Sequence, residues 1–129
     1  MDTDKEREKL DRLTERIIGC AYEVSNTLGC GFLEKVYENA LAIELRRAGL
    51  RLEQQKPIQV RYKGELVGEY ILDLLVEGVV IIEVKALDAL DNAHSAQCLN
   101  YLKATENRVC LLFNFGQPKV QLRRFVRDF

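Results

Sequence analysis

The stretch LDLLVEGVVIIEVKAL, residues 72–87, decides the fold. Two apolar runs flank the dipeptide Glu77-Gly78, which is typical of a turn between two strands. Both runs are apolar at almost every position, and this pattern favours central strands that helices cover on both faces. Asp73, Glu83 and Lys85 interrupt the runs. Because a buried charge is costly, these three positions require an explanation.

The length of the turn determines whether the three charges meet. Glu83 and the lysine two residues later share a face of their strand. A two-residue turn would place Asp73 opposite Ile82 and on the other face from Glu83. A three-residue connection with Gly78 in the left-handed conformation shifts the register by one, so that Asp73 faces Ile81 and lies diagonal to Glu83. We predict the odd-length connection, because only it gathers the charges.

The gathered carboxylates predict a metal site. They would repel each other and raise each other's pKa unless a cation lies between them. Oxygen ligands of this kind suit Mg²⁺ or Mn²⁺, which keep several waters. We expect Asp73, Glu83 and the carbonyl of Val84 to be ligands, with Lys85 stabilising a hydroxide or the charge on a scissile phosphate. The alternative is a structural ion pair in which Lys85 neutralises one carboxylate and leaves the other uncompensated.

Hydrophobic periodicity predicts the other elements: steps of three and four indicate helices, and alternation indicates strands. The expected helices span residues 10–28, 32–48 and 88–105, and the expected strands span residues 57–64, 65–76, 79–87, 107–115 and 119–129. The order α-α-β-β-β-α-β-β predicts an α/β (α+β mixed-sheet) fold, with helices packed on a central five-stranded sheet. We expect one domain over residues 1–129, with an N-terminal helix in 1–28, a core over 32–115 and a C-terminal edge strand in 116–129.

The composition excludes some classes of function. Nineteen basic residues balance twenty acidic ones, so polyanion binding would require a local basic patch or a metal. The four cysteines form no CxxC pair, which argues against a zinc ribbon. No apolar run approaches the roughly 18 residues of a membrane span, and the charged first ten residues lack a signal region. We therefore expect a soluble, cytoplasmic protein with no membrane partner and no small-molecule cofactor.

Two motifs resemble those of a nuclease superfamily. Asp73, a spacer of nine and then Glu83-Val84-Lys85 is similar to the D-x(n)-E-x-K pattern of PD-(D/E)XK nucleases, although Leu72 stands where the pattern has proline. The segment GFLEKVY, residues 31–37, resembles the GxxExxY motif of small bacterial and archaeal proteins in that superfamily. The similarity extends over about residues 17–124 and includes AQCLNYLKAT and LLFNFG. It implies a restriction-endonuclease-like core and Mg²⁺- or Mn²⁺-dependent hydrolysis of nucleic acid, with DNA as the expected substrate.

The resemblance also implies roles for two residues outside the turn. Glu34 corresponds to the acidic residue that many such nucleases place near the metal on the first core helix, and Glu38 is its possible substitute. A helix-start carboxylate favoured by the macrodipole is the alternative for Glu34. Gln97 matches a glutamine near the active site of related nucleases, and it shares a helix face with His94 and Tyr101.

The leading hypothesis is therefore a metal-dependent nuclease. The alternative is a catalytically weak or inactive module of the same fold that binds nucleic acid or protein, which the near-neutral charge and the short chain favour. The apolar stripe over residues 10–28 suits either an extension of the core or a homodimer seam. A homodimeric scaffold with purely structural charges is the third hypothesis.

Overall fold

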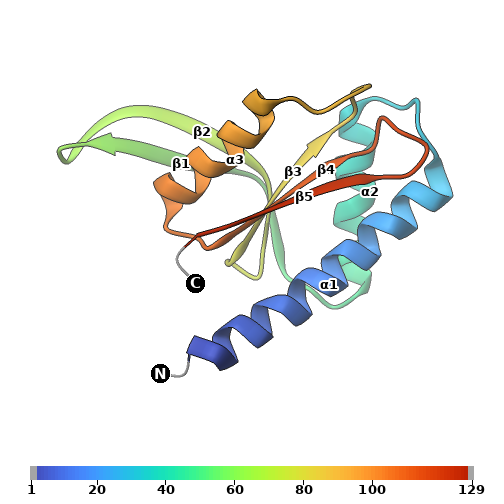
Figure 1. Cartoon of the computed structure of the whole chain (residues 1–129), viewed down its shortest axis with the longest axis horizontal. Helices are drawn as coiled ribbons and strands as arrows, with labels where there is room; N and C mark the ends of the chain where they lie inside the picture. Colours follow the sequence, from blue (N-terminus) through green and yellow to red (C-terminus); the bar gives the residue numbers. More distant parts are fainter. Residues whose placement is uncertain (1–2, 128–129) are drawn as a thin grey trace.

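Three helices and a five-stranded sheet make up the computed structural model, which describes residues 3–127 (Figure 1). The helices are α1 (Thr3–Leu28), α2 (Glu34–Arg47) and α3 (Asn92–Thr105), and the strands are β1 (Leu52–Tyr62), β2 (Glu65–Val76), β3 (Val80–Lys85), β4 (Val109–Asn114) and β5 (Gln121–Val126). The predicted order of elements and the mixed α+β class are confirmed. No helix within the described residues is long and apolar enough to cross a membrane.

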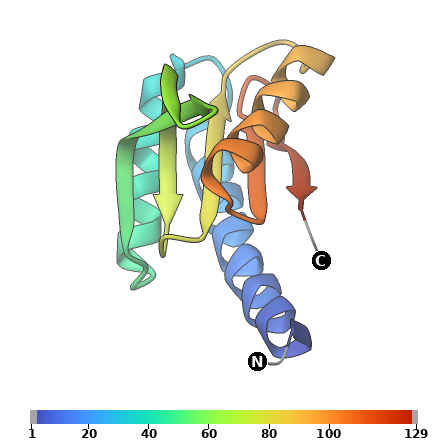
Figure 2. The same ribbon diagram turned by 90° about the vertical axis from the view of Figure 1, so that its left-hand side faces the viewer.

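The strands lie in the order β1-β2-β3-β4-β5, with β5 at an edge as predicted. β3 and β4 run parallel, and the other neighbouring pairs run antiparallel. The connection from β3 to β4 contains α3, because parallel neighbours need a long crossover. α1 and α2 pack on one face of the sheet and α3 packs on the other (Figure 2). β3 and β4 are therefore buried along almost their whole length, as their continuous apolar sequence requires.

Helix α3 begins at Asn92, four residues later than the hydrophobic pattern predicts. The side chain of Asp91 accepts hydrogen bonds from the backbone N–H groups of Ala93 and His94. In return, Nδ1 of His94 accepts a hydrogen bond from the backbone N–H of Asp91. This reciprocal capping box fixes the start of the helix and leaves the preceding residues as a loop.

β1 and β2 form a long hairpin that extends past the rest of the sheet (Figure 1). β2 pairs with β3 only over residues 74–76, so the outer part of the hairpin, residues 57–71, has no third strand beside it. We call residues 57–71 the arm. The residues of β2 in the arm are mostly exposed. The prediction that β2 is covered on both faces therefore holds near its end and is wrong for residues 65–71.

The side chains of the hairpin switch from one face of the sheet to the other at the point where Gln55 lies beside Asp73. The backbone of Gln55 is left-handed, with φ of 54°, and the ladder is interrupted at this point. Leu74 packs in the core with α1 and α2, whereas Leu72 packs in the core with α3. Regular alternation would place both leucines on one face. Asp73 is thus located where the strand turns over between the two cores.

Candidate functional site

The hairpin of β2 and β3 brings Asp73 and Glu83 together. Its connection has three residues and contains Gly78 in the left-handed conformation, so the predicted odd-length connection is confirmed. The observed register places Leu75 opposite Ile81. The predicted pairing of Asp73 with Ile81 is therefore wrong, because the turn ends one residue after Gly78. Continued by two residues, this register sets Asp73 directly across from Glu83, closer than the predicted diagonal.

Beyond the last ladder pair, side chains take over the bonding between the two strands. The backbone N–H of Asp73 donates to Oε1 of Glu83 at 3.2 Å. The backbone N–H of Val84 donates to Oδ2 of Asp73 at 2.8 Å. Each carboxylate thus accepts a hydrogen bond that a main-chain carbonyl of the neighbouring strand would otherwise accept. The regular ladder ends at the pair of Leu74 and Ile82, and we call the part of the β2–β3 pair beyond it the gap.

Burial disfavours the charged forms of both carboxyl groups of this pair. Glu83 is only 2% exposed, and burial followed by the charge of Asp73 raises its pKa to about 9. The pKa of Asp73 is also raised, chiefly by burial, although the N–H of Val84 and the charge of Lys85 oppose the shift. At neutral pH the pair therefore holds a proton unless a cation replaces it.

Glu34 lies in the first turn of α2, where the helix dipole favours a carboxylate. Its side chain is exposed, yet partial burial raises its pKa. The charge of Lys85 lowers that pKa and the charge of Asp73 raises it, so Glu34 lies within electrostatic reach of both. α2 therefore brings Glu34 within electrostatic reach of the carboxyl pair, and its role at a metal stays a prediction.

Glu38, one turn further along α2, is the buried carboxylate of this helix, with 3% of its surface exposed. Its charge raises the pKa of Asp73. Three side chains donate hydrogen bonds to it: Lys35, Gln54 and Gln55. The sequence pattern offered Glu38 only as a substitute for Glu34 and did not single out Gln55. The only feature of the sequence that marks Gln55 is its place in the segment Gln-Gln-Lys-Pro near the start of β1.

Gln97 lies half-buried on α3, and its Nε2 donates to Oη of Tyr101 at 2.8 Å. Tyr101 is 3% exposed, and burial together with the charges of Glu83 and Asp73 raises its pKa. Tyr101 therefore contacts Gln97 directly and lies within electrostatic reach of the carboxyl pair. His94, which was expected on the same helix face, has its Nδ1 occupied in the capping box of α3.

Asn114 and Gly116, which follow from the end of β4, hold the segment after Lys85. Asn114 is completely buried; its Oδ1 accepts from the N–H of Leu87 at 2.8 Å and its Nδ2 donates to the Leu87 carbonyl at 2.9 Å. The N–H of Phe115 donates to the carbonyl of Lys85 at 2.8 Å. A Cβ atom at Gly116 would overlap the backbone of Leu87. The apolar run before it predicts this Asn-Phe-Gly segment only as the end of a strand, and its contacts with Leu87 appear only in the structure.

Tyr37 of the Gly31–Tyr37 motif belongs to the core. Its hydroxyl donates to the carbonyl of Gly29 at 2.6 Å and accepts from the N–H of Phe32 at 3.1 Å. Its ring stacks on Phe115 with 4.9 Å between centroids. The tyrosine therefore pins the turn before α2 to the sheet, which positions Glu34.

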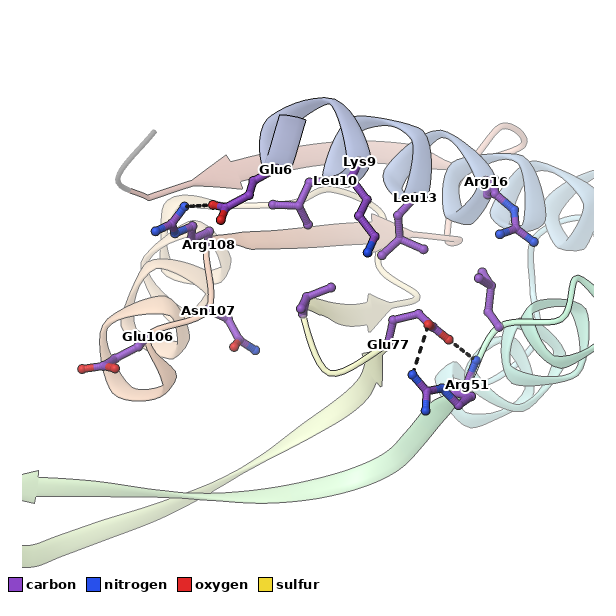
Figure 3. Close-up of a pocket in the computed structure, with 12 residues that line it drawn as sticks. Glu6, Lys9, Leu10, Leu13, Arg16, Arg51, Glu77, Glu106, Asn107 and Arg108 are labelled. Atoms are coloured by element: carbon purple, nitrogen blue, oxygen red, sulfur yellow. Dashed lines mark hydrogen bonds and ion pairs between the residues drawn. The ribbon is translucent and has the colours of Figure 1, made fainter. Parts of the chain in front are cut away.

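A cavity of about 550 Å³ lies at the opposite end of β3 from Lys85 (Figure 3). α1, the turn between β2 and β3, and the segment after α3 surround it. Its wall contains apolar side chains such as Leu10 and Leu13, and an ion pair between Arg51 and Glu77 crosses its rim at 3.6 Å. None of the expected site residues lines this cavity. The candidate site of this chain therefore does not lie in this cavity.

The carboxyl pair offers oxygen ligands, which are the ligands that hard cations prefer. Within residues 3–127, no three Asp, Glu, His or Cys side chains converge closely enough to hold a metal ion. Mg²⁺ is commonly bound through one or two carboxylates, while waters and substrate phosphates complete its coordination. Two neighbouring carboxylates fit this pattern, and they do not fit a structural zinc site.

Comparison with known proteins agrees with this geometry. A model described as the PD-(D/E)XK nuclease superfamily matches residues 11–125. No curated protein matches the chain, and no solved structure matches it. The matched range includes every residue of the candidate site.

Proposed function

The chain belongs to the PD-(D/E)XK nuclease superfamily, and on this premise we propose that it hydrolyses phosphodiester bonds in nucleic acid, with DNA as the expected substrate and Mg²⁺ or Mn²⁺ as the cofactor. The observation that supports the proposal most strongly is the pair of the partly buried Asp73 and the buried Glu83, both within electrostatic reach of Lys85. One lysine cannot neutralise two carboxylates, and a divalent ion would compensate the remaining charge. The motif at residues 31–37 further assigns the chain, in this proposal, to the GxxExxY branch.

The ion would bind in the gap between β2 and β3. In an extended strand the N–H and C=O of one residue point to the same side. The N–H of Val84 points to Asp73, so its carbonyl faces the same gap and would be the third ligand beside Asp73 and Glu83. Glu34, which is exposed at the start of α2, would bind through a water. The remaining positions would be taken by waters and a phosphate oxygen.

The residues around the gap supply the other elements of hydrolysis. When bound, the ion would lower the pKa of a water and offset the charge of the phosphate. Lys85 would donate to the attacking hydroxide or to a non-bridging phosphate oxygen, and the contact from Phe115 to its carbonyl fixes its backbone. Because Nε2 of Gln97 donates to Tyr101, Oε1 of Gln97 is the atom that would accept a hydrogen bond from the water and orient it.

A cleavage assay tests this proposal. Labelled single-stranded, duplex and flap DNA and RNA would be incubated with Mg²⁺, with Mn²⁺ and with EDTA. We expect metal-dependent cleavage that Lys85→Ala abolishes while metal affinity is retained. The matched control is Lys103→Ala, which removes an exposed lysine from the last turn of α3 and should leave cleavage unchanged. Metal binding without cleavage of any substrate would instead favour a binding module, and no metal binding would contradict the proposal.

A further inference from the structure

Exposed aromatic rings lie next to the carboxylates in two segments of the chain. Tyr70 lies three residues before Asp73 in β2, and 49% of its surface is exposed. Phe32 lies two residues before Glu34, and 50% of its surface is exposed. An aromatic ring that is exposed next to a site for nucleic acid offers a face on which a base can stack. Both rings are therefore candidates for contact with whatever enters the gap.

A buried tyrosine fixes each of these rings. Tyr70 packs against Tyr101 with 5.7 Å between centroids and an angle of 64°. Phe32 packs against Tyr37 with 6.2 Å between centroids and an angle of 71°. Each ring is thus held on one side by the core and open to solvent on the other. Rings fixed in this way lose little conformational freedom when a planar group stacks on them.

The ring of Tyr70 lies on the same side of the sheet as Gln97. Tyr101 contacts both residues, through its ring and its hydroxyl respectively. The arm and α3 lie side by side in both views (Figures 1 and 2). Further apolar side chains of the arm are exposed: Tyr62, Leu66, Val67 and Ile71. Because Tyr70 and Ile71 are consecutive in β2 and point to opposite faces, the arm carries exposed apolar side chains on both faces.

The charges around the gap offer few cations to phosphates, so base stacking would have to supply more of the binding. Of the described residues, four carboxylates lie at or near the gap: Glu34, Glu38, Asp73 and Glu83. Two lysines nearby are already paired, Lys35 with Glu38 at 3.0 Å and Lys56 with Glu53 at 2.9 Å. Binding of a duplex depends mainly on Lys and Arg contacts to phosphates. Unpaired bases also stack on aromatic rings, regardless of their sequence.

We propose that the substrate presents unpaired bases at the site, as in a single strand, a flap or a frayed end, and that Tyr70 and Phe32 stack on bases on either side of the scissile phosphate. This inference rests on the proposed nuclease function and names its substrate class. An intact duplex would bury its bases between its own strands and leave both rings without a partner.

Binding of labelled oligonucleotides, followed by fluorescence anisotropy, tests the proposal. Affinities for one strand and for the same sequence as a duplex would be measured in EDTA, and again with Mn²⁺ in a Lys85→Ala background that does not cleave. We expect the single strand to bind at least tenfold more tightly than the duplex. Tyr70→Ala and Phe32→Ala should each weaken binding of the single strand about five- to thirtyfold, whereas Tyr70→Phe should preserve it. The matched control is Tyr22→Ala, which removes an exposed tyrosine from α1.

Equal affinity for strand and duplex, or no effect of either alanine substitution, would overturn the inference. A change of oligomeric state in Tyr70→Ala, with unchanged affinity for the single strand, would assign the ring to self-association and would also overturn it. The binding measured in EDTA does not require the metal ion. It therefore tests the stacking proposal independently of the nuclease proposal. Binding of single strands that depends on Tyr70, in a protein that binds no Mn²⁺, would refute the hydrolysis and retain the stacking surface.

Discussion

Replacing Glu83 with glutamine should stabilise the metal-free protein at neutral and alkaline pH. The ordinary pKa of this carboxyl is 4.5, and in the fold it is raised to about 9 by burial and by Asp73. Between these values the folded protein holds a proton that the unfolded chain has released. Wild-type stability is therefore fully present below about pH 4.5 and falls as the pH rises toward 9.

The magnitude follows from linkage. One proton held only by the folded state gives a slope of at most about 1.4 kcal/mol per pH unit. Over the roughly 2.5 units from the ordinary value to pH 7, the cost reaches about 3 kcal/mol as an upper figure. Glu83→Gln cannot ionise and retains an oxygen that can accept the N–H of Asp73. The variant should therefore gain on the order of 1–3 kcal/mol over wild type near pH 7.

Urea denaturation from pH 5 to pH 9 in EDTA measures this difference. The matched control is Glu69→Gln, an exposed carboxylate of the arm, which should follow the wild-type pH profile. Mg²⁺ should raise the midpoint of wild type more at pH 8 than at pH 6, because the ion displaces a proton, and should not raise that of Glu83→Gln. A variant that is less stable than wild type throughout, with an unchanged pH slope, would refute the reasoning.

Three further substitutions and one control substitution test the scaffold that holds the site. Gly116→Ala should destabilise the fold by about 2 kcal/mol or more in urea denaturation, since its Cβ would overlap the backbone of Leu87. Gly19→Ala, a helical glycine with open space around it, should instead stabilise by about 0.5–1 kcal/mol, and equal effects of the two would contradict the clamp. Tyr37→Phe should cost about 1–2 kcal/mol through its lost hydrogen bonds and leave the cleavage rate constant of the folded fraction unchanged; a specific loss of that rate would give the hydroxyl a catalytic role. Asp91→Ala should cost about 0.5–2 kcal/mol through loss of the α3 cap, and no change in the melting temperature would argue against the capping box.

The turn between the two central strands was predictable because its determinants are local. Glu77-Gly78 between two apolar runs indicates a hairpin, and the requirement that like charges share one cation selects the odd-length connection. The same local reasoning placed the end of the turn one residue too early. Asp73 consequently meets Glu83 directly instead of diagonally, because the ladder closes at Val76 and Val80 and leaves Val79 in the turn.

The surroundings of the carboxyl pair depend on contacts between residues far apart in the chain. Glu38 is buried because Gln54 and Gln55, in a different element, donate hydrogen bonds to it. No periodicity in α2 distinguishes Glu38 from the exposed Glu34 one turn earlier. Asn114 likewise acquires its role only when the crossover through α3 returns the chain beside Leu87. Local patterns predict such side chains as helix surface or strand, and only the assembled sheet reveals their partners.

A crystal grown with Mn²⁺ and examined by anomalous diffraction tests the central claim most directly. We predict one anomalous peak in the gap between β2 and β3, about 2.0–2.3 Å from carboxylate oxygens of both Asp73 and Glu83, and its loss in Asp73→Asn. A fully loaded crystal with no peak between these two side chains, or with the ion held elsewhere, would contradict the account.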